Sequence, residues 1–221
     1  MEKTRVLIID DHSVVIDGVQ SILSREGDME LAATAATADE ALKVLNAGGI
    51  DLAIADITLK GHISGIDLTK AIRDRFPEVK VLVMSMHDDL VYGERAIKAG
   101  AGGYLMKEVA SLQLVTAIRT IMAGELYVSE KLQKRIMNKL LQGPGGAGAI
   151  SIDGLSDREF EVFQLIGNGF STREIAGKLN VSANTVESHR NRIKQKLNLE
   201  SSAELSRHAI QWVISQKQDN G

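Results

Sequence analysis

Several short apolar runs of this chain end on residues that could do chemistry. The residues are two adjacent carboxylates, a third carboxylate, a hydroxyl and an amine: Asp10, Asp11, Asp56, Ser85 and Lys107. Carboxylate oxygens suit Mg²⁺, which in proteins takes one or two carboxylates and keeps several waters. A carboxylate can also act as a nucleophile and become an aspartyl-phosphate. Because a lysine and a metal ion would neutralise the phosphoryl oxygens, the set predicts a phosphoryl-accepting site.

The segments around these residues alternate between strand and helix patterns. Short apolar runs that suit buried strands lie at 6–9, 29–36, 51–56, 79–84 and 103–106. Segments with apolar residues at helical spacing follow them at 14–23, 38–45, 68–76, 92–99 and 112–122. Successive strand–helix units of this kind indicate an α/β domain with a five-stranded, parallel, doubly wound sheet.

The order of these units predicts where the reactive groups lie. Right-handed crossovers place the carboxyl ends of parallel strands at one edge of the sheet, where such sheets do their chemistry. Asp56, at the end of the central run, is then the best candidate for the reactive group. Each residue alone has a plainer explanation, since Asp and Ser are common helix caps and a single Lys is commonly a surface charge. Suitable groups at several strand ends favour a site.

Bulk properties exclude other kinds of site. The chain has 221 residues and no cysteine, so a disulfide framework, a thiolate nucleophile and a zinc–thiolate site are impossible. The length suggests one or two domains. The apolar run 6–9 is too short for a signal peptide core or a membrane span, so we expect a cytoplasmic protein with no membrane partner.

A composition change divides the chain. Residues 125–142 are polar and helix-compatible, with Leu132, Ile136 and Leu140 on one face, and the glycine-rich run Gln142–Ala149 then breaks all periodicity. Such a run behaves as a flexible tether. We therefore predict a first domain at 1–124, a linker at 125–153 and a second domain at 154–221.

The second domain shows start signals for four short helices. Ser156 and Ser171 each begin a capping box with a Glu three residues later. Ser182 can cap a helix at 183–197, and Ser201 or Ser202 one that runs through Trp212. The spacing predicts a small all-α domain in which 171–179 and 182–197 form a helix-turn-helix.

Charge is distributed unevenly along the chain. Basic and acidic residues balance from Asp153 onward, so the formal net charge of −3 arises upstream. Within the neutral part, basic residues crowd on one segment: Arg190, Arg192, Lys194 and Lys196. A local basic stripe is a better DNA signal than overall charge. A solvated helix face is an equally good explanation of the crowding alone.

The carboxylates, hydroxyl and lysine resemble those of response-regulator receiver domains, whose fold is flavodoxin-like. The resemblance implies that a sensor histidine kinase supplies a phosphoryl group and that Asp56 accepts it. It also implies that Mg²⁺ is held by Asp11, Asp56 and the backbone carbonyl of Thr58, with Asp10 acting through water. Ser85 and Lys107 would turn onto the phosphoryl group, and Tyr104, at the family's aromatic switch position, would turn inward.

Departures from the receiver pattern lie close to Asp56. Lys60 stands where receivers commonly have Pro, and the expected Gly arrives one residue late, as Gly65. This indicates a one-residue insertion and an extra positive charge in the loop. Glu108 replaces a Pro that the NarL/FixJ class often lacks. Thr58 and His87 occupy positions that in this family tune the lifetime of the phosphoryl group.

The second domain resembles LuxR-type DNA-binding domains in the motifs Leu155–Glu159 and Thr185–Arg190, followed by Ile193, Lys196 and Leu197. The resemblance implies base contacts from Glu187, Ser188 and Asn191. It implies phosphate contacts from Thr185, Arg190, Arg192 and Lys194. Glu187 would read a cytosine or be repelled by phosphate. His189 is expected to pack inward, and the final helix is expected to support a homodimer.

Together these features predict a response regulator of the NarL/FixJ class. Phosphorylation of Asp56 would release the helix-turn-helix domain for dimeric binding to double-stranded DNA. We expect no enzymatic activity beyond assistance of its own phosphoryl transfer. Three alternatives are a phosphorylation-independent regulator, an aspartyl-phosphate type phosphatase and a protein-interaction module. Thr58 argues against the phosphatase, which would need a second Asp at that position.

Overall fold

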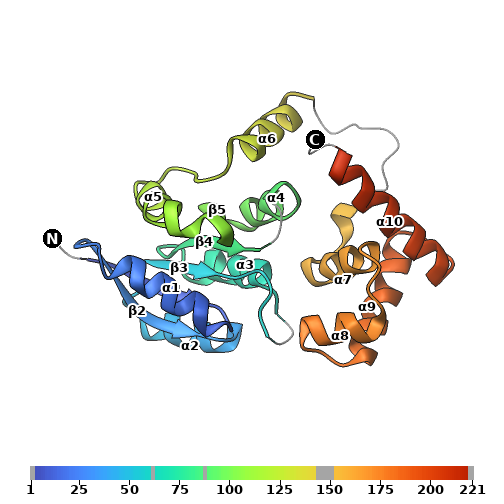
Figure 1. The fold of residues 1–221 in the computed structure, drawn as a ribbon, viewed down its shortest axis with the longest axis horizontal. Coiled ribbons are helices and arrows are strands. Elements are labelled where there is room, and N and C mark those ends of the chain that lie inside the picture. Colours follow the sequence, from blue (N-terminus) through green and yellow to red (C-terminus); the bar gives the residue numbers. More distant parts are fainter. Residues whose placement is uncertain (1–2, 61–62, 87–88, 143–151, 219–221) are drawn as a thin grey trace. The chain divides into compact units, whose positions relative to one another are not determined.

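The computed structural model describes residues 3–60, 63–86, 89–142 and 152–218 (Figure 1). The chain divides into two compact units, Met1–Pro144 and Gly145–Gly221. The predicted glycine-rich tether lies outside the described residues from 143 onward. Each unit has a hydrophobic core of its own.

The first unit is built on one five-stranded sheet. Its strands are β1 (Thr4–Ile9), β2 (Met29–Ala35), β3 (Leu52–Ala55), β4 (Lys80–Ser85) and β5 (Gly103–Met106). They pair in the order β2-β1-β3-β4-β5, and every pair is parallel. The predicted fold class is confirmed. β3 is the central strand and is buried along its whole length, which explains why its sequence is a short, uniformly apolar run.

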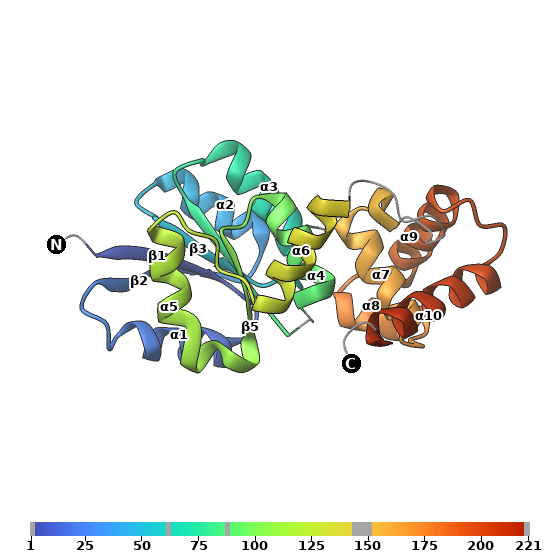
Figure 2. The same cartoon turned by 90° about the horizontal axis from the view of Figure 1, so that it is seen from above.

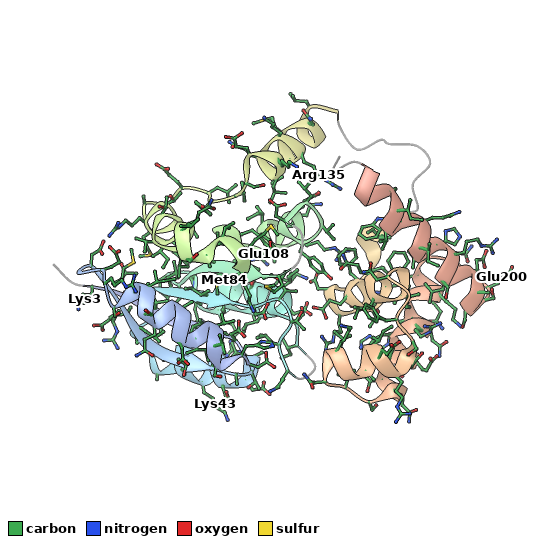
Figure 3. All side chains as sticks on the ribbon, in the orientation of Figure 1. Lys3, Lys43, Met84, Glu108, Arg135 and Glu200 are labelled. Atoms are coloured by element: carbon green, nitrogen blue, oxygen red, sulfur yellow. The ribbon has the colours of Figure 1, made fainter. Side chains whose placement is uncertain are left out.

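Helices cover both faces of this sheet. Figure 2 shows α1 (Ser13–Leu23) and α5 (Ala110–Met122) on one side, with α2 (Ala38–Ala47) and α3 (Gly65–Arg75) on the other. The helix α4 (Asp89–Ala99) packs against α3 and β5. Alternate strand residues point to opposite faces, so Val6 and Ile8 enter the core beneath α1 and α5. Met84, labelled in Figure 3, is buried in the same core.

The segment after α5 differs from the helical extension expected at 125–142. The backbone around Tyr127 lies beside β5, where Tyr104 N–H donates to the Tyr127 carbonyl at 2.8 Å and Tyr127 N–H donates to the Gly102 carbonyl at 3.0 Å. The helix α6 begins only afterwards and spans Glu130–Gln142. The reason is that β5 is an edge strand, whose free backbone groups offer partners that a helix at 125–129 would forgo.

Leu132 anchors α6 on the first unit. Its side chain is fully buried, whereas Ile136 on the same face is half-buried. A Cβ placed on Gly93 of α4 would lie 2.4 Å from the Leu132 methyl and 3.6 Å from the Tyr104 ring. Gly93 therefore leaves the space that Leu132 fills. Leu140, the third residue of the predicted apolar face, has a side chain outside the described ones.

The second unit is the predicted set of helices. A short 3₁₀ turn at Ile152–Gly154 precedes α7 (Asp157–Gly167), α8 (Thr172–Leu179), α9 (Ala183–Lys196) and α10 (Ser202–Gln218). Both predicted capping boxes are present, at Ser156 and Ser171. Ser182 caps α9 by accepting from Thr185 N–H at 3.1 Å. α10 continues past the predicted end at Trp212 to Gln218.

Aromatic packing holds these helices together. The Trp212 ring meets Phe160 and Phe163 edge to face, with ring centroids 5.4 and 6.0 Å apart. α10 approaches α7 closely at Gly167, where a Cβ would lie 2.5 Å from the Ala209 carbonyl oxygen. Between α8 and α9 the chain turns at Asn180, whose φ of 52° is left-handed and suits Asn. Among the described residues, no helix is long and apolar enough to cross a membrane.

Candidate functional site

The carboxyl edge of the sheet brings the predicted residues together. Lys107 Nζ lies 2.6 Å from Asp10 Oδ2 and 2.6 Å from Asp56 Oδ2. The Lys107 side chain is 8% exposed, that of Asp56 6% and that of Asp10 1%. A buried ammonium between two buried carboxylates therefore forms the centre of the site.

Backbone hydrogen bonds hold both carboxylate residues in place. Asp10 N–H donates to the Ala35 carbonyl at 3.0 Å, and Asp56 N–H donates to the Ile9 carbonyl at 2.9 Å. Each aspartate thus continues the hydrogen bonding of its strand by one residue. Lys107 follows β5 directly in a short 3₁₀ turn, Lys107–Val109, and its peptide bond to Glu108 is trans.

Gly65 fits closely against the backbone of Asp56. Its N–H donates to the Ile57 carbonyl at 2.8 Å, and a Cβ there would lie 1.8 Å from the Asp56 carbonyl oxygen. Any larger residue would push α3 away from the end of β3. The one-residue insertion before Gly65 stays a prediction, and residues 61–62 of this loop lie outside the described ranges.

Burial and neighbouring charges together raise the pKa values of both Asp56 and Lys107. Burial raises the pKa of the Asp56 carboxyl; the Lys107 ammonium lowers it in part, and the Asp10 carboxylate raises it further. Burial alone would lower the pKa of Lys107, but Asp56 and Asp10 outweigh it and raise that pKa. Lys107 therefore stays charged between the two carboxyl groups.

The remaining predicted receiver residues lie around this pair. Ser85 ends β4 and is fully buried, and Tyr104 is 2% exposed, so its ring points inward. Thr58 N–H donates to Asp56 Oδ1 at 3.4 Å, which places the Thr58 backbone beside the carboxylate. His87 lies outside the described residues.

Donor atoms at this edge could hold a cation. One ligand atom each from Asp10, Asp11, His12 and Asp56 lies within 4.8 Å of the others. Asp10 Oδ2 and Asp11 Oδ1 are both buried at this edge. Their nearest cationic partners are Lys107 Nζ at 2.6 Å and His12 Nδ1 at 3.0 Å. A carboxylate oxygen can accept from one donor and still offer a lone pair to a cation, so the donor set fits Mg²⁺.

Two neighbours of the pocket were not predicted. His12 Nδ1 lies 3.0 Å from both Asp10 Oδ1 and Asp11 Oδ1, and the sequence signal for it was only its position next to the acidic pair. Lys60 Nζ lies 3.4 Å from Asp11 Oδ2. The sequence indicated the extra positive charge of Lys60 in the loop, but not the carboxylate that it contacts.

The second unit presents a polar helix face on α9. Val186 and Ile193 are buried and Leu197 half-buried, so the opposite face is open. Exposed on it are the predicted DNA contacts Glu187, Ser188, Asn191 and Arg192. Half-buried are Thr185, Lys194 and the predicted packing residue His189. Arg190 is only 13% exposed and lies 3.7 Å from Glu187.

Glu187 is fixed by the preceding helix. Thr172 Oγ1 donates a hydrogen bond of 2.7 Å to Glu187 Oε1. The carboxylate is therefore oriented before any partner arrives. Lys196, one of the crowded basic residues, is exposed, and its amine lies 2.7 Å from Glu159 Oε2 and links α9 to the start of α7.

Comparisons with known proteins assign both units. Residues 6–119 match the response regulator receiver domain family, and residues 153–209 match the luxR family of bacterial regulatory proteins. The chain is a response regulator. Its receiver and LuxR-type DNA-binding domains confirm the family predicted from the sequence. Such a pair supports phosphorylation-controlled regulation of transcription.

The regulator resembles known proteins over nearly its whole length. It is 39% identical over 209 residues to the oxygen regulatory protein NreC of Staphylococcus aureus, covering 93% of this chain and 96% of NreC. A structure of the RcsB response regulator of Salmonella typhimurium is 26% identical, covers 94% and 98% of the two chains and has a TM-score of 0.57. A LuxR-family two-component response regulator from Aurantimonas is 30% identical over 63% of this chain and 99% of its own, with a TM-score of 0.58.

Proposed function

We propose that the regulator is a transcription factor switched by phosphorylation of Asp56. The observation that carries the proposal is the buried contact of Lys107 Nζ with Asp56 Oδ2 and Asp10 Oδ2, 2.6 Å in each case, in a chain that also has a DNA-binding domain. A sensor histidine kinase is the proposed phosphoryl donor. An Asp56 oxygen forms the new bond to phosphorus while the bond from phosphorus to the donor histidine nitrogen breaks.

The residues around Asp56 have distinct roles in this transfer. Lys107 stabilises the charge on the phosphoryl oxygens, because its ammonium is already next to the attacking carboxylate. Asp11, Asp56 and the Thr58 carbonyl would hold Mg²⁺, with Asp10 acting through water. When bound, this ion supplies further neutralisation of the phosphoryl oxygens. Ser85 then donates a hydrogen bond to one of those oxygens.

Tyr104 and α6 provide a route from the pocket to the second unit. Tyr104 shares its backbone pairing with Tyr127, and its ring lies beneath Gly93 and Leu132. A movement of Ser85 and Tyr104 on phosphorylation therefore changes the support of α6, which leads to the DNA-binding domain. The change releases that domain and favours a homodimer. Val14 of α1 and Leu112 of α5, 81% and 84% exposed, belong to the proposed dimer face.

DNA recognition is proposed for the open face of α9. Glu187, Ser188 and Asn191 read base edges, while Thr185, Arg190, Arg192 and Lys194 contact phosphates. The Thr172 hydrogen bond leaves Glu187 Oε2 to accept from a cytosine amine. The related RcsB structure is described in terms of conformational dynamism for DNA interaction, which supports the same role here. A dimer would span half-sites about one helical turn apart.

The test is Asp56→Asn in the full chain. With Mg²⁺ and a radiolabelled small phosphodonor, we expect complete loss of phosphoryl incorporation and of phosphodonor-driven dimerisation and DNA binding. Asp74→Asn, at an exposed carboxylate of α3, is the matched control and should keep all three. Unchanged phosphodonor-driven dimerisation and DNA binding in Asp56→Asn would disprove the switch.

A phosphorylation-independent regulator is the second candidate. The contact of Lys60 with Asp11, 3.4 Å between Nζ and Oδ2, favours it, because a cation of the chain itself already lies at the pocket. In that case the wild-type chain would take up no phosphoryl group from the small phosphodonor and would bind DNA equally well with and without it. Magnesium-dependent incorporation would exclude this candidate.

A further inference from the structure

Lys60 departs from the receiver pattern, and its backbone position is defined by a neighbouring segment. It forms an isolated parallel bridge with Thr37, the residue that caps α2. Thr37 in turn follows β2, the partner of β1, which leads into Asp10 and Asp11. The loop after Asp56 is thereby held beside the acidic pair, and the Lys60 side chain starts from a fixed place.

The amine of Lys60 adds a second lysine to the pocket. Its Nζ lies 3.4 Å from Asp11 Oδ2, with the Lys60 side chain 52% exposed and that of Asp11 8% exposed. Lys107 pairs with the other two carboxylates, Asp10 and Asp56. Each carboxylate at this edge thus has a lysine ammonium within ion-pair distance. Lys60 is the more exposed of the two lysines and can move into solvent.

We propose that Lys60 is an internal competitor for the divalent cation at Asp11. The inference rests on the metal-assisted function proposed above. A metal ion on Asp11 would share the carboxylate with an ammonium, and the two like charges repel one another. Metal binding therefore requires the Lys60 amine to leave Asp11 Oδ2. Because a half-exposed ion pair is weak, the competition lowers metal affinity by about five-fold and does not abolish binding.

The experiment measures binding of Mn²⁺ alone to the full chain. Free Mn²⁺ is followed by electron paramagnetic resonance at low ionic strength, with Mg²⁺ added as a competitor. Lys60→Met should bind Mn²⁺ about five-fold more tightly than wild type. Lys60→Arg keeps the charge and should bind as wild type does. The gain of Lys60→Met should shrink as salt is raised.

Lys70→Met is the matched control. Lys70 forms an ion pair of similar length and exposure, 3.5 Å to Asp67 with the lysine side chain 44% exposed, but on α3. Lys70→Met removes one positive charge from the chain, as Lys60→Met does. A general electrostatic effect on Mn²⁺ binding would therefore appear in both variants. Equal Mn²⁺ affinities for Lys60→Met and Lys70→Met, or weaker binding in Lys60→Met, would overturn the proposal.

Asp11→Asn separates this inference from the function on which it rests. If Asp11→Asn fails to weaken Mn²⁺ binding, the metal site itself is wrong and the competition falls with it. If Asp11→Asn weakens binding while Lys60→Met leaves it unchanged, the site stands and only the role of Lys60 is refuted. Weaker Mn²⁺ binding in Asp11→Asn together with tighter binding in Lys60→Met supports both the metal site and the competition by Lys60.

Discussion

The two polar regions of this regulator use charge in opposite ways. In the receiver pocket the Asp10, Asp56 and Lys107 side chains are each less than a tenth exposed and come from different strand ends. On α9 the Glu187 side chain is 51% exposed, and the predicted DNA contacts around it all come from this one helix. Buried charges interact strongly and cannot be removed singly without cost, whereas exposed charges act nearly independently and are screened by salt.

The difference between buried and exposed charges predicts the largest loss of stability for Lys107→Met. Without metal, two buried carboxylates lose their ammonium, so we expect the receiver to lose about 3–5 kcal/mol of unfolding free energy. Added Mg²⁺ should restore part of it. Urea unfolding followed by far-UV circular dichroism records both units, and fluorescence of Trp212, the single tryptophan, reports the second unit alone, so the receiver transition is the part that the fluorescence does not follow. Lys98→Met breaks a 2.8 Å pair with Glu94 in which the lysine side chain is 67% exposed, and should cost about 1 kcal/mol or less. Equal losses of unfolding free energy in Lys107→Met and Lys98→Met would contradict the stronger role given to the buried charges.

A second test moves the backbone behind the pocket and leaves its charges alone. Gly65→Ala places a Cβ 1.8 Å from the Asp56 carbonyl oxygen. We expect a loss of about 3 kcal/mol from overpacking, with slower phosphoryl incorporation. Gly18→Ala in α1 meets no atom within 4 Å and should stabilise the receiver by about 1 kcal/mol. If Gly65→Ala is as stable and as readily phosphorylated as wild type, the loop is not constrained at this point.

On α9 the expected changes are smaller and depend on salt. Lys194→Ala should weaken binding to all DNA sequences alike and reduce the slope of log affinity against log salt by about one. Arg207→Ala, at an exposed residue of α10, should leave the slope unchanged. Fluorescence anisotropy with labelled duplex DNA at several salt concentrations measures the affinity and the salt slope of each variant. A sequence-dependent loss without a change of slope would assign Lys194 to base contacts.

The smallest effect concerns the link between α7 and α9. Burial raises the pKa of the Glu159 carboxyl, but hydrogen bonds from Lys196 and Ser156 outweigh it and hold that pKa below its usual value of 4.5. A carboxyl with a lowered folded pKa stabilises the fold above its unfolded pKa, and this stability is lost as the pH falls through the folded pKa.

Glu159→Gln should therefore lower the stability of the second unit at pH 7 by about 1 kcal/mol. Below the folded pKa the variant and wild type should converge. Urea unfolding followed by Trp212 fluorescence between pH 7 and pH 3 measures the difference. A constant difference across this range would mean that the Glu159 charge contributes nothing.

Much of the fold could be predicted because its signals are local. The apolar runs, the helical spacing between them and the capping boxes at Ser156 and Ser171 involve residues within a few positions of each other. The helical extension was predicted too early for a non-local reason. Residues around Tyr127 pair with the edge of β5, more than twenty positions upstream, and no local pattern reports that edge.

The candidate site divides in the same way. The sequence by itself determined which groups stand at the strand ends, because strand length and crossover handedness place Asp56 and Lys107 at one edge. The tertiary structure alone decided that Lys107 bridges Asp10 and Asp56 and that Lys60 reaches Asp11. Side-chain contacts between distant segments depend on how the elements pack to within a few ångströms, and residue type and spacing do not specify distances that fine.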